Sequence, residues 1–139
     1  MTGATSSHDS PLRGWLWASA VFTLSGALMF GISHPQLASV TGLPTEVPAI
    51  YRALTVLMML LFGSAYGWMA TRKVIDRTLV AFGAIAKLAA FATLTTLWMA
   101  SEITTRTWTL IGADLVFACA FLWCLRTTAS TPSSARSIA

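Results

Sequence analysis

YRALTVLMMLLFGSAYGWMA, residues 51–70, contains one charged side chain, that of Arg52 near its start. About 20 apolar residues in a helix are enough to cross the roughly 30 Å of hydrocarbon in a bilayer. A strand of a membrane barrel would alternate apolar and polar side chains, and this segment does not. The segment is therefore predicted to be a transmembrane helix.

Three further segments have the same character, and they cover residues 15–32, 79–100 and 107–125. A helix satisfies its own backbone hydrogen bonds, which the hydrocarbon of a bilayer cannot do. We therefore predict an all-α fold, an integral membrane four-helix bundle over residues 15–126. The polar segments 1–14 and 127–139 lack the hydrophobicity needed to order themselves and are predicted to be disordered cytoplasmic tails.

The composition excludes a soluble domain. Hydrophobic residues make up 55% of the chain and charged residues only 10%, and the mean hydropathy is +0.69. A soluble domain carries about 25% charged residues. The net charge is +4, but lysine and arginine form no run and no basic helix. Nucleic acid is therefore not an expected partner, because its binding needs a concentrated basic patch.

The basic residues predict the orientation in the membrane. Six of them fall on one side of the predicted spans: Arg13, Arg72, Lys73, Arg77, Arg126 and Arg136. Arg52 and Arg106 fall on the other side. Since basic residues concentrate in cytoplasmic loops, both termini are predicted to be cytoplasmic.

The first outer loop, residues 33–50, is predicted to hold a short helix. Leu37, Val40 and Leu43 recur at about helical spacing, and Pro35 suits a first helical turn. We expect this helix to lie at the outer membrane interface, above the bundle.

Two ionisable residues lie inside the predicted spans, Lys87 and Asp114. Each costs about 2.5–3.5 kcal/mol at a helix centre on the insertion scale. Measured from the turn that joins their helices, Lys87 is deeper by about six residues, or roughly 9 Å at the helical rise. A lysine side chain can bridge that difference. The two residues are predicted to form a direct or water-mediated ion pair, because burying them together costs less than burying them apart.

Other polar residues are predicted to converge near this pair under the outer loop. They are Arg52, Glu102 and His34, with Tyr66 as a deeper hydrogen-bonding wall. Three interpretations of the cluster stay open. It can fix the register of the helices, bind a lipophilic molecule that carries one polar group, or perform acid–base catalysis with Asp114 as the catalytic residue.

No metal and no cofactor are predicted. Cys119 and Cys124 are five residues apart, which places them about 140° apart around a helix, so they cannot form a disulfide within it. The two histidines, His8 and His34, fall on opposite sides of the membrane. A metal site would need convergent histidine, cysteine or carboxylate ligands.

Four short motifs resemble a loose group of small bacterial four-span proteins, some of them grouped as DoxX-like. The motifs are Tyr51-Arg52-Ala53-Leu54, Gly63-x-x-Tyr66-Gly67, Gly83-x-x-x-Lys87 and Gly112-x-Asp114-x-x-Phe117. The resemblance implies the four-helix architecture and a location in the bacterial inner (plasma) membrane, and it draws attention to Arg52, Lys87 and Asp114. DoxX-type relatives have been tied to quinone-linked redox complexes. This chain has no redox ligand or reactive cysteine pair, so the resemblance supplies no activity.

The leading hypothesis is a small membrane protein that holds a lipophilic ligand or partner in a polar pocket opening outward. Arg52 and Lys87 would supply positive charge and Asp114 would orient them. The alternatives are a membrane enzyme that transfers protons on an isoprenoid-like or sterol-like substrate, and an accessory subunit with a purely structural ion-pair network. The predicted partners are the lipid bilayer, a lipophilic small molecule, and a partner subunit or second copy of the chain. Gly63-x-x-x-Gly67 suits close helix packing, either inside the bundle or in a dimer.

Overall fold

The computed structural model describes residues 10–32, 35–43 and 46–129, and these residues form helices, turns and short connections without any strand. The five helices are α1 (Ser10–Ile32), α2 (Pro35–Thr41), α3 (Ala49–Thr71), α4 (Arg77–Met99) and α5 (Thr105–Ala129). Four of them, all except α2, are long and apolar enough to cross a membrane. The chain is thus an all-helical, multi-pass membrane protein.

The long helices extend beyond the spans that hydropathy marks. Helix α1 begins at Ser10 rather than at residue 15, with Pro11 in its first turn, where the missing N–H costs nothing. Arg13 holds this end in place, because its guanidinium donates to the carbonyls of Ala70 at 2.7 Å and Lys73 at 2.8 Å. Helix α5 continues to Ala129. The parts of the predicted tails at 1–9 and 130–139 lie outside the described residues.

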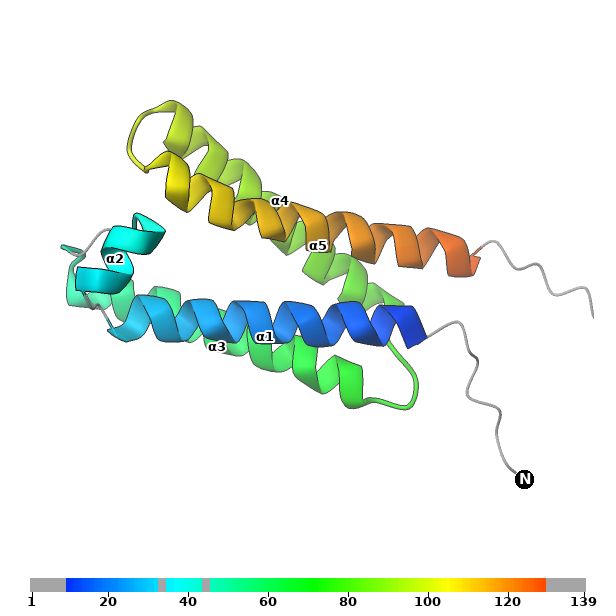
Figure 1. Cartoon of the computed structure of the whole chain (residues 1–139). Coiled ribbons are helices and arrows are strands. Elements are labelled where there is room, and N and C mark those ends of the chain that lie inside the picture. The colour runs from blue at the N-terminus through cyan, green and yellow to red at the C-terminus, as the bar shows by residue number, and fades with distance from the viewer. Residues whose placement is uncertain (1–9, 33–34, 44–45, 130–139) are drawn as a thin grey trace, which may run out of the picture.

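The four long helices pack as two pairs (Figure 1). Helix α1 lies along α3, and α4 lies along α5, whereas α3 and α4 contact each other little although a short turn joins them. We call the end with Ser10, Ala129 and the α3–α4 turn the tail end. The opposite end, which has α2 and the α4–α5 turn, is the loop end.

Small residues bring α1 and α3 together. An added Cβ on Gly63 would lie 2.8 Å from the side chain of Leu24, and one on Gly67 would lie 3.7 Å from Trp17. The Gly63-x-x-x-Gly67 stripe therefore packs inside the molecule, against α1, and is not a free surface for a second copy.

The hydrophobic core lies in the half of the molecule near the tail end. Its centre is Phe121 of α5, which is fully buried beside Tyr66 of α3, with the ring centroids 5.8 Å apart. Leu16 of α1 and Val80 of α4 complete it, so all four long helices meet there. Membrane helices do not gain from a hydrophobic effect between them, so close packing around such a ring holds the two pairs together.

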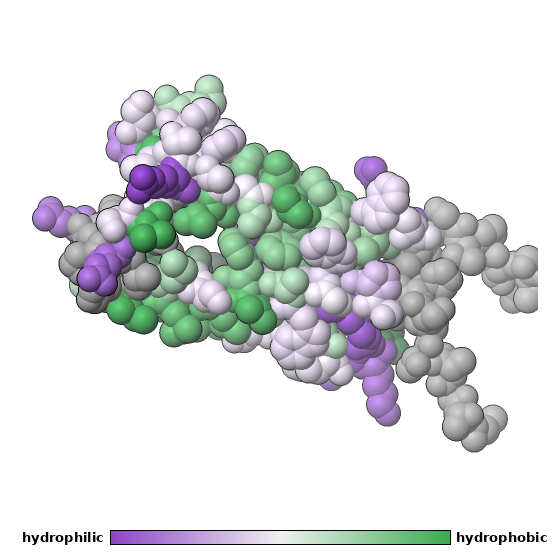
Figure 2. All heavy atoms as spheres, viewed as in Figure 1, coloured by the Kyte–Doolittle hydropathy of each residue, from purple (hydrophilic) through white to green (hydrophobic). Residues whose placement is uncertain are grey.

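Towards the loop end the two pairs separate. No residue of α3 from 49 to 62 is buried, and none of α4 from 88 to 99. Figure 2 shows a gap between the pairs in this half of the molecule, which we call the interpair opening. The core therefore closes only one end of the space between the pairs.

Helix α2 crosses the loop end and is fastened to α5. Arg106 donates to the carbonyl of Ser39 at 2.8 Å, and Thr107 donates to the carbonyl of Thr41 at 3.3 Å. Gly42 ends α2 with a φ of 72°, the left-handed conformation that suits glycine after a helix. The short helix predicted from Pro35 onwards is present, and it connects the α1–α3 pair to the α4–α5 pair.

Candidate functional site

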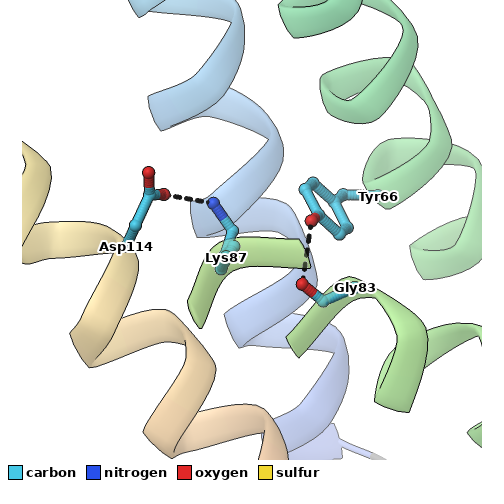
Figure 3. Close-up of polar contacts among 4 residues, drawn as sticks. All are labelled: Tyr66, Gly83, Lys87 and Asp114. Carbon is cyan, nitrogen blue, oxygen red and sulfur yellow. Dashed lines mark hydrogen bonds and ion pairs between the residues drawn. The ribbon is translucent and has the colours of Figure 1, made fainter. Parts of the chain in front are cut away.

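The two charged residues inside the spans form an ion pair (Figure 3). Lys87 lies near the middle of α4 and Asp114 near the middle of α5, and Lys87 Nζ is 2.5 Å from Asp114 Oδ1. The Lys87 side chain is 6% exposed, whereas that of Asp114 is 21% exposed. The helical arithmetic that predicted this pairing from the sequence is therefore correct. It is the one ion pair between residues that the structure describes.

Two aromatic rings enclose the Lys87 ammonium. Its Nζ lies 5.2 Å from the ring centroid of Tyr66 and 5.2 Å from that of Phe117. A cation near the face of an aromatic ring is attracted by the ring quadrupole, and the attraction grows when water is excluded. The ammonium is thus held by one carboxylate and two rings, which explains how α4 carries a lysine at this depth.

Gly83 makes room for the Tyr66 ring, because an added Cβ there would lie 2.8 Å from Tyr66 Cε1. The Tyr66 hydroxyl donates to the Gly83 carbonyl at 3.4 Å (Figure 3). Gly83 and Lys87 are one turn apart on α4, so the same helix face accepts the tyrosine ring and presents the ammonium to it.

Helix α1 forms a further wall of the site. The ring of Phe117 packs against Trp15 and Phe22, at centroid distances of 6.2 and 5.6 Å. Ser19 lies between these two on the same face of α1. Among the described residues, the buried hydroxyl oxygens of Ser19 and Thr23 have no hydrogen-bond partner. Buried polar groups normally have one, so these two hydroxyls call for an explanation.

The ion pair lies where the core ends. Lys87 is the last buried residue of α4 towards the loop end, and the helices separate directly beyond it. The pair therefore lies at the edge of the core, where the two helix pairs begin to separate, and Asp114 is its more exposed member.

The structure brings Lys87, Asp114 and Tyr66 together and places Arg52 and Glu102 elsewhere. Arg52 lies at the start of α3, where it donates to the carbonyl of Val47 at 3.4 Å. Glu102 is exposed in the turn before α5, and Asp114 lies nine residues into that helix, roughly 13 Å further along its axis. His34 lies outside the described residues.

Sequence reasoning placed Phe117 in one motif with Asp114 but did not assign it to the site, and it missed the hydroxyls of α1. Phe117 follows Asp114 by three residues and so shares its helix face, a spacing that could have indicated its place. Ser19 and Thr23 are polar residues one turn apart within an apolar span, which is also a readable signal. Within the described ranges, no three histidine, cysteine, aspartate or glutamate side chains gather where they could hold a metal ion.

No family model matches this chain, and comparisons with curated proteins and with solved structures found no match either. Its function is therefore inferred from the geometry of the site.

Proposed function

We propose that this protein binds a lipophilic molecule in the interpair opening, with the polar group of that molecule against the Lys87–Asp114 pair. The observation that supports the proposal is the position of the pair at the edge of the core: Lys87 is the last buried residue of α4 towards the loop end, and Asp114 is partly exposed. If the pair only fixed the register of the helices, we would expect both side chains to be fully buried, because a buried charge is costly wherever it is incompletely paired.

The surroundings of the pair suit an amphipathic guest. Phe22 and Phe117 provide an apolar wall for the body of a ligand, next to the ion pair. Binding sites for small molecules are mostly apolar, with a few polar groups that fix the orientation of the ligand. Helix α2 and its bonds to α5 limit the opening at the loop end, which leaves the side between the pairs as the way in from the lipid.

The proposal includes an orientation. The tail end carries Arg13, Arg72, Lys73, Arg77 and Arg126, so it is assigned to the cytoplasm. The opening then faces the outer leaflet of a bacterial inner membrane, with α2 at the outer interface. A ligand would enter sideways from that leaflet.

The first test is mass spectrometry of the molecules that co-purify with the protein in native-lipid discs. We expect a specific lipophilic molecule with the wild type and its loss by about tenfold or more with Asp114→Asn, since a hydrogen bond to a buried charged group is worth about 1.5–3 kcal/mol. Asp76→Asn is the matched control. Asp76 caps α4 by accepting from the backbone N–H of Thr78 at 2.8 Å, and asparagine caps helices equally well.

Bulk lipid alone in all three samples would contradict the proposal. In that case the ion pair serves the register of the helices, and the protein is an accessory subunit whose partner has to be sought.

A proton-transfer enzyme is the second candidate, favoured by one observation. Among the described residues, the hydrogen bonds of Asp114 use Oδ1 alone. A carboxylate held by a cation, with its second oxygen uncommitted, is the arrangement of a general base. Incubating the co-purified molecule with wild type and with Asp114→Asn tests this candidate. Product formed equally by both would exclude it.

A further inference from the structure

We infer that the ligand presents an uncharged hydroxyl to Asp114, so that its chemical class is a lipophilic alcohol with a long-chain or polycyclic body. This inference rests on the proposed function and deepens it. It follows from three features of the site: which member of the ion pair is exposed, the net charge of the site, and the unpartnered hydroxyls on α1.

The more exposed residue of the pair determines whether the ligand must donate or accept a hydrogen bond. The Lys87 ammonium is enclosed by Asp114 and by the rings of Tyr66 and Phe117, and its side chain is 6% exposed against 21% for Asp114. A group entering the opening therefore meets a carboxylate oxygen. An ionised carboxylate only accepts hydrogen bonds. The head group of the ligand must therefore be a donor, and a carboxylate or phosphate head would meet a like charge.

The net charge of the ion pair disfavours a ligand with a cationic head group. Lys87 and Asp114 together carry no net charge, so an ammonium head group would leave one uncompensated positive charge in an environment of low dielectric. Burying a hydroxyl is far less costly, and one good hydrogen bond compensates most of it. The site therefore favours a neutral donor over a cationic one.

Helix α1 supplies the second hydrogen bond that a hydroxyl can make. Phe117 contacts both Trp15 and Phe22, which places it level with Ser19. Helices α1 and α5 run in opposite directions, so Asp114, three residues before Phe117, is about level with residue 22 of α1, next to Thr23. The buried Thr23 hydroxyl has no partner among the described residues. An alcohol between the two helices would donate to Asp114 and accept from Thr23, which also explains the unpartnered hydroxyl.

Photocrosslinking in phosphatidylcholine nanodiscs tests the inference. Four probes share one diazirine-bearing sixteen-carbon chain and differ in the head group: alcohol, methyl ether, carboxylate or primary amine. Labelled peptides are located by mass spectrometry, and labelling of residues 19–23 and 114–117 is measured. We expect the alcohol to label these residues about tenfold more than each of the other three probes.

Two variants sharpen the test. Thr23→Val, which keeps the shape of the side chain, should lower alcohol labelling about fivefold, because the oxygen of the alcohol loses its donor. Asp76→Asn, at the tail end, should leave the labelling by all four probes unchanged. Because Thr23→Val disturbs no hydrogen bond between described residues, it tests the site without breaking the ion pair.

The possible failures are distinguishable. Labelling of these residues by the ether, carboxylate or amine at the level of the alcohol would overturn the assignment of the head group while keeping the opening as a binding site. Labelling no stronger than on the lipid-facing surface, with every probe, would overturn the proposed function as well. An unchanged alcohol signal in Thr23→Val would remove the second hydrogen bond from the inference and overturn its geometry.

Discussion

Lys87→Met is expected to lower the free energy of unfolding by roughly 3–5 kcal/mol, the usual cost of removing one partner of a buried ion pair. Methionine keeps the length of the side chain, so packing against Tyr66 and Phe117 is largely retained. The loss comes from Asp114, which would keep its carboxylate at mid-membrane depth without the cation. Equilibrium unfolding in mixed detergent micelles measures the change.

The double variant Lys87→Met with Asp114→Leu should recover most of that loss. Replacing a whole buried pair by apolar residues of similar volume is often neutral or stabilising. The energy of the double variant, compared with the two single variants, gives the coupling between the side chains. If the double variant is no more stable than Lys87→Met alone, the unpaired Asp114 carboxylate is not the cause of the lost stability. If it is stable but retains the co-purified molecule, the pair is not the binding site.

Phe121→Ala is expected to cost about 2–3 kcal/mol, below the roughly 3–5 kcal/mol that such substitutions cost in soluble proteins. Phe121 is fully buried and packs on Tyr66, where the two helix pairs meet. In a membrane the unfolded helices remain in hydrocarbon, so the transfer part of the usual penalty is absent. The remaining cost comes from the cavity, because the side chains that line it lose their dispersion contacts with the Phe121 ring.

The matched control is Phe82→Ala on α4, because Phe82 is 59% exposed and its ring centroid lies 6.4 Å from that of Phe62 of α3, away from the Phe121 core. We expect this change to cost less than about 1 kcal/mol, since lipid replaces the lost ring. Unfolding of both variants in the same micelles gives the comparison. Equal losses at the two positions would mean that the core at the tail end does not hold the pairs together.

The spans were predictable because hydrocarbon imposes a strict rule on the backbone, and four long apolar segments follow from it directly. Exact helix ends were not, because they depend on capping and on tertiary bonds. Asp76 caps α4, so that helix starts at Arg77 and not at residue 79. Arg13 stabilises the first turns of α1 by donating hydrogen bonds to the carbonyls of Ala70 and Lys73, near the α3–α4 turn.

The ion pair was predictable because the helical rise fixes depth, and Lys87 and Asp114 lie on helices joined by a short turn. The predicted convergence of Arg52 and Glu102 rested on depth alone, which says nothing about distance across the bundle. The separation of the two helix pairs could not be predicted from the sequence either. Apolar residues facing lipid and apolar residues facing a neighbouring helix are alike in hydropathy, so the sequence pattern does not show which faces pack.

Lys87 leaves the ribosome 27 residues before the partner that neutralises it. Presented to lipid alone, α4 would carry an uncompensated ammonium at a cost of about 2.5–3.5 kcal/mol. The turn between α4 and α5 spans only residues 100–104, so both charges can enter together once α5 is made. Glycosylation mapping of nascent chains stopped before residue 105 would reveal α4 outside the bilayer, and full insertion of such chains would contradict this order. Helices α1 and α3, which have no charge at mid-span, can leave the translocation channel one by one, whereas α4 and α5 are expected to be released as a single hairpin.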